Sequence, residues 1–350
     1  MDIEYLIGSK EEFFNFVEGI TEKDKIAIFS HNDLDGIASA VFLEKLLEAK
    51  GKLISVTKFI NYEKELFEGS YNEAKKNGVT KFFVCDLALD SFAKDKYIEL
   101  TNNNELFLLD HHPINLEIKE MKNTIKANSF DCAAMIVYDL GEGIIDTDEW
   151  AWLVCATMFS EYSYSKQENF NFINSIYPDF SGDNLSTSTP GITARKISSA
   201  LIYFEDKKKV YDLVLDKNLE EIGSAYEIIE DEINEYVDSF MNSAEFYADK
   251  KLYYLEISPK FNVRSIIATL VSKLKPEYSI IVVSISEDKE FAKVSARNHG
   301  KSADMNALMK AGIEGLKDAN GGGHVPASAA KVRKEDLKKF KENILKALEK

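Results

Sequence analysis

The sequence predicts an α/β protein: an N-terminal domain with a parallel sheet, joined by a long helix to a smaller α/β domain. Over the first 150 residues, short apolar runs alternate with amphipathic segments. One apolar stripe with helical spacing runs through residues 219–246. The alternating pattern resumes after residue 250. We therefore divide the chain into residues 1–218, a helical linker at 219–248, and residues 249–350.

The first part contains four predicted strands, which are Lys25–Phe29, Leu53–Ile60, Val79–Cys85 and Glu105–Leu109. Gly36–Ala49 is a predicted helix, since its apolar residues recur on one face. Glu149–Phe159 (EWAWLVCATMF) is a predicted buried helix. Ser160–Gly191 mixes aromatic residues with Ser, Asn and Thr, and we expect an irregular insertion that serves as a lid, a subunit contact or a specificity loop.

The predicted linker helix covers Leu219–Phe246. Its apolar stripe consists of Ile222, Tyr226, Ile229, Ile233, Val237 and Phe240. The elements predicted after it are strand Leu252–Ile257, helix Val263–Leu274, strands Tyr278–Ser284 and Phe291–Ala296, a helix around Ser302–Lys310, a glycine-rich loop and a final helix from Lys334.

Composition restricts the location and the partners of the chain. Its 350 residues carry a formal net charge of -16, which argues against a protein that coats long nucleic acid. No apolar run approaches the roughly 18 residues of a membrane span, and the N-terminus shows no secretion signal. The three cysteines are widely spaced without a CxxC pair, as in reduced thiols. We expect a cytoplasmic protein without membrane contact; a homodimer is compatible with the sequence.

Acidic and histidine residues follow three of the predicted strands. The first strand runs into His31, Asp33 and Asp35, the third into Asp86, and the fourth into "DHH", which is Asp110, His111 and His112. The carboxyl ends of parallel strands lie along one edge of a sheet, so these side chains should converge. They would repel one another without a cation.

One aspartate after a strand is commonly a helix cap, and one histidine is commonly a packing residue. Three such groups at successive strand ends are much harder to obtain by capping alone. The sequence therefore predicts a site for one or two divalent metals, and the mixture of Asp and His favours Mn²⁺ over a purely oxygen-ligated Mg²⁺ or Ca²⁺. Metal ions would also let an acidic protein accept a small anionic substrate.

The stretch "NGGGHVPASAA" (320–330) predicts an anion-binding loop in the last part of the chain. Its glycines let the backbone approach an anion closely, and His324 can donate a hydrogen bond to a phosphate. Arg297 and Asn298 end a predicted strand nearby in the sequence. The alternatives are a turn without a ligand and a surface salt bridge. We prefer a substrate-binding wall, because the acid-lined site needs one.

In order and spacing these motifs resemble the DHH phosphoesterase superfamily with its DHH-associated C-terminal domain. "HNDLDGIASA" is similar to the first motif, Asp86 to the second, "DHH" to the third and "GGGH" (321–324) to the C-terminal motif. "SHNDLDG" resembles the subgroup of nanoRNase B and related predicted phosphohydrolases. The resemblance covers nearly the whole chain. It implies a DHH phosphoesterase domain at 1–218 and a substrate-binding domain at 249–350.

The resemblance also implies roles for individual residues. A pair of Mn²⁺ ions, with Mg²⁺ or Co²⁺ as substitutes, would be bound by Asp33, Asp35, Asp86 and His111, with His31 as a further ligand. His112 would contact the scissile phosphate, and Asp110 would orient a neighbouring histidine. The far side of the nucleotide would be held by Arg297, Asn298, Gly321, Gly322, Gly323 and His324.

Two positions depart from the family pattern. The fourth motif supplies a further metal-binding Asp, and here Glu161 in "TMFSEY" (157–162) is the nearest carboxylate. Either Glu161 substitutes, or one metal is held more weakly, or the motif lies elsewhere. Asn320 also stands where many relatives have a fourth glycine.

The function that we expect is Mn²⁺-dependent hydrolysis of short oligonucleotides, or of pAp-like bisphosphorylated nucleotides, with closure of the second domain over the crevice. Cleavage of cyclic dinucleotides stays open, and hydrolysis of pyrophosphate or polyphosphate is less favoured. A processive exonuclease of the RecJ kind usually carries further nucleic-acid-binding modules. From another class, the chain could be a nucleotide-binding sensor that lost catalysis through the change at Glu161. A purely structural α/β protein has little support.

Overall fold

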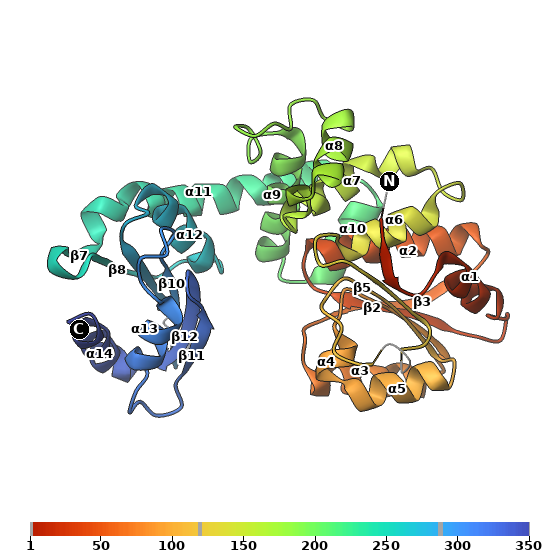
Figure 1. Cartoon of the computed structure of the whole chain (residues 1–350), viewed down its shortest axis with the longest axis horizontal. Helices are drawn as coiled ribbons and strands as arrows, with labels where there is room; N and C mark the ends of the chain where they lie inside the picture. The colour runs from red at the N-terminus through yellow and green to blue at the C-terminus, as the bar shows by residue number, and fades with distance from the viewer. Residues whose placement is uncertain (1–2, 118–120, 286–289, 350) are drawn as a thin grey trace. The chain divides into compact units, whose positions relative to one another are not determined.

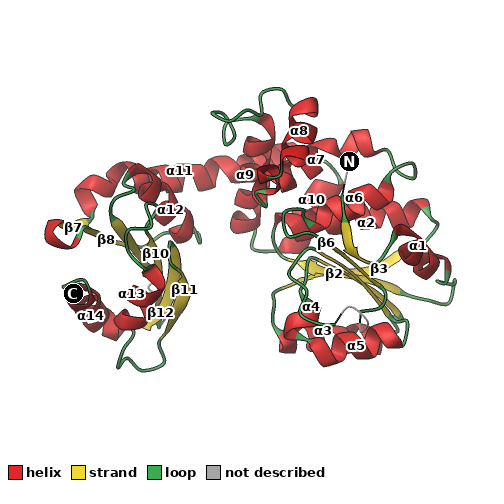
Figure 2. Cartoon of the chain, in the orientation of Figure 1, coloured by secondary structure: helices red, strands yellow, loops and turns green. Residues whose placement is uncertain are grey.

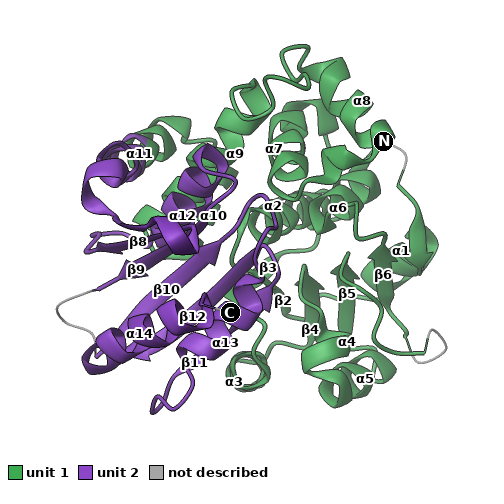
Figure 3. Ribbon diagram, turned by 60° about the vertical axis from the view of Figure 1, so that its left-hand side comes forward, with its two compact units in different colours: residues 1–226 green, residues 227–350 purple. Residues whose placement is uncertain are grey.

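The computed structural model describes residues 3–117, 121–285 and 290–349. The chain divides into two compact units, residues 1–226 and 227–350 (Figure 3). The boundary falls inside the long helix α11 (Leu219–Ser243), so one continuous helix contributes to both units. Each unit has its own six-stranded sheet, and the predicted α/β class is confirmed (Figures 1 and 2).

The first sheet has the order β1-β6-β5-β4-β2-β3. Its strands are β1 (Tyr5–Ile7), β2 (Ile26–His31), β3 (Ile54–Ile60), β4 (Lys81–Cys85), β5 (Leu106–Asp110) and β6 (Thr124–Ala127). All neighbouring pairs are parallel except β1 with β6. The four strands predicted from the sequence are confirmed as β2 to β5. The short strands β1 and β6 were not predicted, because three or four residues carry too little periodic signal.

Helices cover both faces of this sheet (Figure 1). On one face α1 (Lys10–Glu18), α2 (Leu34–Ala49) and α6 (Ala133–Gly141) enclose a core that contains Phe83 and Phe107. On the other face α3 (Lys64–Lys76), α4 (Leu89–Phe92) and α5 (Lys94–Asn102) enclose a core that contains Phe82 and Leu108. Since side chains alternate along a strand, neighbouring residues of β4 supply opposite cores.

The segment after the predicted buried helix is more regular than the sequence indicates. That helix is confirmed as α7 (Thr147–Ser160), but residues 160–191 are not one irregular insertion, because they contain α8 (Gln167–Ile176) and the start of α9 (Thr189–Tyr203). Ile173 and Phe180 are fully buried in the first core. The polar residues between the aromatics concealed this packing. Helix α10 (Lys207–Leu215) follows and packs against α2.

The second sheet has the order β11-β12-β10-β9-β8-β7. Its strands are β7 (Glu245–Tyr247), β8 (Leu252–Ile257), β9 (Ser279–Ser284), β10 (Phe291–Arg297), β11 (Asn320–His324) and β12 (Ala327–Arg333). Only β8 and β9 are parallel. The sheet packs with α12 (Arg264–Leu274), α13 (Met305–Gly312) and α14 (Leu337–Ala347).

Two predictions for this unit are wrong in detail. The linker helix ends at Ser243 instead of Phe246, because residues 245–247 pair with β8. The glycine-rich stretch is no loop: residues 320–324 form the edge strand β11 of a hairpin with β12. A Cβ atom on Gly323 would lie 2.6 Å from the carbonyl oxygen of Ala327. The glycines thus allow the backbones of β11 and β12 to pair closely. From the sequence pattern alone, such a run of glycines predicts a turn.

Within the described ranges, no helix is both long enough and apolar enough to cross a membrane.

Candidate functional site

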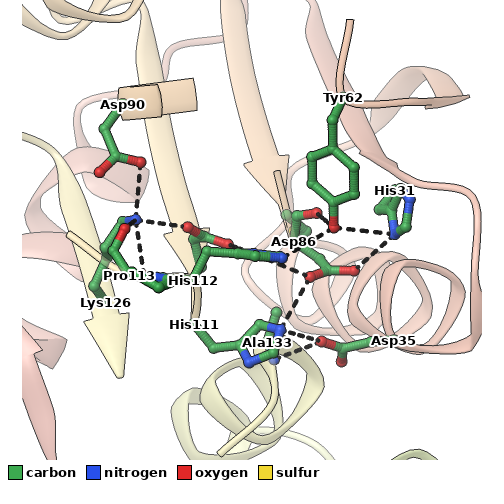
Figure 4. Close-up of polar contacts among 12 residues, drawn as sticks. His31, Asp35, Tyr62, Asp86, Asp90, His111, His112, Pro113, Lys126 and Ala133 are labelled. Atoms are coloured by element: carbon green, nitrogen blue, oxygen red, sulfur yellow. Dashed lines mark hydrogen bonds and ion pairs between the residues drawn. The ribbon is translucent and has the colours of Figure 1, made fainter. Parts of the chain in front are cut away.

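The predicted convergence of strand ends is confirmed in the first unit. β2 ends at His31, β4 is followed directly by Asp86, and β5 ends at Asp110. These strands are neighbours in one parallel sheet, so their carboxyl ends lie at the same edge. Figure 4 shows the side chains that gather there.

The motif "DLDG" builds the sharp connection from β2 into α2. Asp33 is the N-cap of the helix, and its carboxylate accepts a hydrogen bond from the N–H of Gly36 at 3.0 Å. A Cβ atom at position 36 would lie only 2.0 Å from the carbonyl oxygen of His31. Glycine is therefore required for the helix to begin this close to the strand, and the close start places Asp33 beside His31.

Asp86 lies at the centre of the site. Its φ of 54° is in the left-handed region that few non-glycine residues adopt, a kind of strain often stored at functional sites. The side chain is 2% exposed, and neither carboxylate oxygen has a hydrogen-bond partner within the described residues. Oδ2 lies 3.4 Å from Nδ1 of His31, and Oδ1 lies 3.4 Å from Nε2 of His111.

Two groups of side chains in the described part of the chain have the donor atoms and spacing to hold a metal ion. They share Asp86: one group adds His31 and Asp33, the other His111 and His112. A buried carboxylate without hydrogen-bond partners is costly unless a cation neutralises it. The donor chemistry thus fits a divalent metal, and mixed Asp and His ligands suit Mn²⁺.

In the metal-free cluster, the negative charges of the carboxylates raise the pKa values of two histidines. Burial lowers the pKa of His31, but Asp33 and Asp86 outweigh it and raise the pKa to about 10. Burial likewise lowers the pKa of His111, and the carboxylates around it raise the pKa to about 10. Protons on these imidazoles therefore take the place of a cation among the carboxylates.

Asp35 has a structural task that the sequence did not reveal. Its two carboxylate oxygens accept hydrogen bonds, each 2.8 Å long, from the backbone N–H groups of Ala133 and Ala134. It thereby caps the first turn of α6 from α2. Burial, followed by the charge of Asp86, raises its pKa well above the ordinary range. Oδ2 is 3.7 Å from Nε2 of His111, so Asp35 borders the two metal-binding groups without being a member of either.

Glu161, at the C-terminus of α7, also borders the cluster. Burial raises the pKa of Glu161 to about 7, helped by the negative charges of Asp33 and Asp86. Its carboxylate is in neither metal-binding group of the described residues. The residue at the expected fourth-motif position thus interacts electrostatically with the site, but its carboxylate is not among the central ligand atoms.

The first and last residues of the "DHH" motif, Asp110 and His112, are paired with each other. Nδ1 of His112 lies 2.8 Å from Oδ1 of Asp110, and the Asp110 side chain is fully buried. Burial would raise the pKa of Asp110, but His112 and Lys126 outweigh it and hold the pKa well below the usual range. Asp110 is therefore an ionised partner for the imidazole.

Sequence reasoning missed Tyr62, which lies two residues after β3. Its hydroxyl is 3.3 Å from Nδ1 of His31 and 3.2 Å from Nε2 of His112, and it donates to the carbonyl oxygen of Asp86 at 3.3 Å (Figure 4). Burial and the nearby carboxylates raise its pKa, which keeps the phenol protonated. The signal was present, because β3 is another strand of the same parallel sheet and ends at the same edge.

In the second unit, Arg297 ends β10 and donates hydrogen bonds to the hydroxyls of Ser265 and Thr269. Asn298 is buried, and its amide group is used in hydrogen bonds to Ser279 and Ser302. The structure therefore gives Asn298 a supporting task in the turn after β10.

A hollow of about 470 Å³ lies against the glycine strand β11. It is lined by Arg264, Lys293, Asn320, Gly321, Gly322, Ala329, Ala330 and Lys331. Sequence reasoning missed Arg264, whose Nε donates to Ser295 and whose Nη1 is buried without a hydrogen-bond partner in the described residues. Burial lowers its pKa, and the charge of Arg297 lowers it further.

Gly323 and His324 continue β11 beyond this hollow. The N–H of Gly323 donates to the side chain of Asn306 at 3.1 Å, and His324 is exposed at the end of the strand. Neither Arg264 nor Arg297 forms an ion pair with a carboxylate of the described chain. Two adjacent guanidinium groups without counterions are suited to an anion.

Comparison with solved structures establishes the fold. The chain is similar to a RecJ exonuclease bound to manganese, with a TM-score of 0.70, 14% identity and coverage of 100% of this chain and 96% of that one. The chain is also similar to an exopolyphosphatase-related protein from Bacteroides fragilis (TM-score 0.51, 19% identity), and the match covers 97% of each chain. A third similar structure is a pGpG-specific phosphodiesterase, PggH, from Vibrio cholerae (TM-score 0.51, 15% identity), and the match covers 93% of this chain and 99% of that one.

No curated protein matches the chain. Two family models do, one for each part of the molecule. Residues 25–158 match the N-terminal domain of the DHH family, and residues 249–350 match the DHHA1 domain. The first match contains the strand-end cluster around Asp86, and the second contains the basic hollow beside β11. The chain therefore belongs to the DHH family, with a DHH N-terminal domain followed by a DHHA1 domain.

Proposed function

We propose that this DHH/DHHA1 phosphoesterase is a Mn²⁺-dependent phosphodiesterase that hydrolyses short oligonucleotides, with pAp-like bisphosphorylated nucleotides as further substrates. The observation that carries the proposal is Asp86, a buried carboxylate without hydrogen-bond partners in the described residues, shared by two groups of metal-binding side chains. A carboxylate in that position can bridge two cations.

The residues present fit two metal ions. His31, Asp33 and Asp86 would hold one, and Asp86 and His111, with Asp35 beside them, would hold the other. Bound there, Mn²⁺ would activate a water molecule and stabilise the charge that develops on the phosphate oxygens. Mg²⁺ or Co²⁺ would be weaker substitutes. Glu161 would complete the coordination from the border of the site, where the ions would offset the burial and the negative charges that raise its pKa.

His112 and Tyr62 would act on the substrate directly. With Nδ1 turned to Asp110, His112 directs Nε2 to the site, where it would contact a phosphate oxygen. The Tyr62 hydroxyl, held between His31 and His112, is a second donor at the same place. Their task would be to orient the phosphate and stabilise its charge.

The second unit would bind the part of the substrate remote from the bond that breaks. Arg264 and Arg297 would pair with a phosphate, and the glycine strand with His324 would approach it closely. A phosphodiester suits the residues of the first unit, and a further phosphate suits those of the second. This favours short nucleotides over pyrophosphate, and the net charge of -16 disfavours long polymers. The PggH relative, whose substrate is pGpG, supports the same substrate size.

One observation favours a second candidate function. Asp35 is already engaged as a helix cap, and Glu161 lies outside both metal-binding groups of the described residues. A site in which one metal is held weakly would describe a nucleotide-binding sensor with impaired catalysis. A single tightly bound Mn²⁺ per chain together with nucleotide binding would favour it.

The test is hydrolysis of a 5′-phosphorylated RNA dinucleotide, pGpG, pAp and cyclic di-AMP, with Mn²⁺ and with EDTA. Wild type, Asp86→Ala and the control Asp95→Ala, an exposed carboxylate on α5, would be compared. The proposal expects Mn²⁺-dependent cleavage of the linear dinucleotides that only Asp86→Ala abolishes. A preference for cyclic di-AMP would assign the protein to turnover of cyclic dinucleotides. Absence of cleavage by wild type would contradict the proposed phosphodiesterase activity.

A further inference from the structure

A fully buried lysine lies behind the "DHH" motif. Lys126 is on β6, and its side chain is 0% exposed, which is rare for this residue type. Its ammonium group donates to Oδ1 of Asp90 at 2.8 Å and to the carbonyl oxygens of His112 and Pro113 at 3.1 and 3.2 Å. It also lies 2.8 Å from Oδ2 of Asp110. Every hydrogen of the ammonium group thus has an acceptor.

Strand register places this lysine. In the parallel pairing of β5 with β6, Asp110 and Lys126 are direct partners. Asp90, at the start of α4, uses its other oxygen to accept a hydrogen bond from the N–H of Asn115 at 2.9 Å. Lys126 and Asp90 together therefore tie the end of β5, the start of α4 and the turn at residues 112–115 to one another.

The consequence falls on His112. Lys126 forms an ion pair with Oδ2 of Asp110, and the other oxygen, Oδ1, lies 2.8 Å from Nδ1 of His112. The same ammonium group fixes the carbonyl oxygen of His112, so both the backbone and the ring of this residue are restrained. A ring that donates its Nδ1–H to Asp110 presents Nε2 on the opposite side, where the hydroxyl of Tyr62 lies 3.2 Å away.

We propose that Lys126 is a positioning residue for the hydrolysis suggested above: through Asp110 and the 112–115 turn it holds the His112 imidazole with Nε2 directed to the substrate. The proposal rests on the proposed function for its catalytic consequence, but the positioning can be measured without it. A stabilising role alone explains the arrangement poorly, because taking an ammonium and two carboxylates out of water costs about as much as their attraction returns. A methionine of similar length would fill the same space in β6.

The variants for the test are Lys126→Met, Lys126→Arg and Asp90→Asn, with Lys10→Met as the control. Lys10 pairs with the buried carboxylate of Asp139 at 2.8 Å, in the same unit but outside the site. Circular dichroism and thermal melts establish that each variant folds. If Lys126→Met does not fold, Asp90→Asn is the decisive variant, since it keeps the lysine and removes only its anchoring charge.

The first readout is the ¹⁵N–¹H spectrum of metal-free protein labelled at its five histidines, with His112 assigned from His112→Gln. We expect a single Nδ1-protonated form of His112 in wild type and Lys10→Met. In Lys126→Met, and partly in Asp90→Asn, we expect a mixture of tautomers, and Lys126→Arg should restore the wild-type signal. An unchanged His112 signal in both Lys126→Met and Asp90→Asn would overturn the proposal.

The second readout is kinetic. We expect kcat to fall by about 10- to 100-fold in Lys126→Met, with KM and Mn²⁺ affinity changed by less than about threefold and kcat of Lys10→Met unaffected. Loss of Mn²⁺ binding with the His112 signal intact would show a merely structural lysine and overturn the proposal. If wild type hydrolyses nothing, the proposed function fails, and the His112 spectra alone decide the positioning.

Discussion

At the scale of single residues, the candidate site is defined by groups that lack their usual partners. Asp86 has a left-handed backbone and a buried carboxylate that forms ion pairs with His31 and His111 at 3.4 Å but no hydrogen bond within the described residues. The histidines on either side of it carry raised pKa values because of the carboxylates. A cation held by the two metal-binding groups would complete the charge balance of this cluster.

Tyr62 gives a prediction at this scale. Tyr62→Phe keeps the ring, which packs against His31 at 4.3 Å between centroids, and removes only the hydroxyl. We expect the melting temperature to stay within about 2 °C. We also expect kcat to fall by about tenfold or more, because one donor toward the substrate is lost. Steady-state kinetics on the RNA dinucleotide check this, and an unchanged kcat would remove Tyr62 from the reaction.

At the scale of elements, the site depends on how closely helices begin after strands. The turn from β2 into α2 contains Asp33 as cap and Gly36 at the point of closest approach. The N-terminus of α6 is held by Asp35 of α2, so two helices and one strand are fixed by side chains of a single short motif. Changes to this motif should therefore affect stability and function together.

Gly36→Ala tests this coupling. The added methyl group would lie 2.0 Å from the carbonyl oxygen of His31, so the start of α2 has to move. We expect a loss of about 2 kcal/mol or more in the free energy of unfolding, together with weaker Mn²⁺ binding. Gly69→Ala in α3 is the control: its Cβ meets nothing within 4 Å, and we expect a gain of about 0.5–1 kcal/mol. Urea denaturation of both variants provides the comparison.

The opposite edge of the same sheet offers a pH-dependent prediction. Hydrogen bonds from the Thr21 backbone and the Thr80 hydroxyl lower the pKa of Asp24, which therefore stabilises the fold above its unfolded pKa and loses this contribution as pH falls through the folded pKa. We expect Asp24→Asn to cost about 1 kcal/mol at pH 7 and less near pH 3. Denaturant titrations at both values check this; an equal cost at both would contradict it.

At the scale of the whole molecule, the chain combines two units of different chemistry. The first unit concentrates carboxylates and histidines at one sheet edge, and the second carries two adjacent guanidinium groups beside a glycine strand. The connection is helix α11, which belongs to both. The proposed function assigns the cation-holding site to the first unit and a basic site to the second.

Arg264→Gln tests the contribution of the second unit. The variant removes the guanidinium group that lines the hollow, and we expect KM for a 5′-phosphorylated dinucleotide to increase by about tenfold with kcat little changed. Arg333→Gln is the control, because that guanidinium already pairs with Glu290 and Asp318. An equal effect of both variants would mean that only the general positive charge matters.

Much of this arrangement was predictable from the sequence, for physical reasons that also explain the failures. Apolar runs such as those of β2 and β4 predict strands from their own residues alone. The residues after them converge because the carboxyl ends of parallel strands lie at the same edge of the sheet. The buried position of Lys126 was not predictable. A lysine in a four-residue strand is expected to be exposed until its register with Asp110 is known. The glycine strand β11 and helix α8 were misjudged, since β11 has no apolar side chains and the apolar residues of α8 alternate with Asn, Glu and Ser.

The most direct test of the central claim is a titration of metal-free protein with Mn²⁺, followed by calorimetry and by electron paramagnetic resonance. The account predicts two ions per chain that are close enough for their spins to couple, and the loss of at least one of them in Asp86→Asn. Absence of Mn²⁺ binding, or binding that Asp86→Asn leaves unchanged, would contradict it.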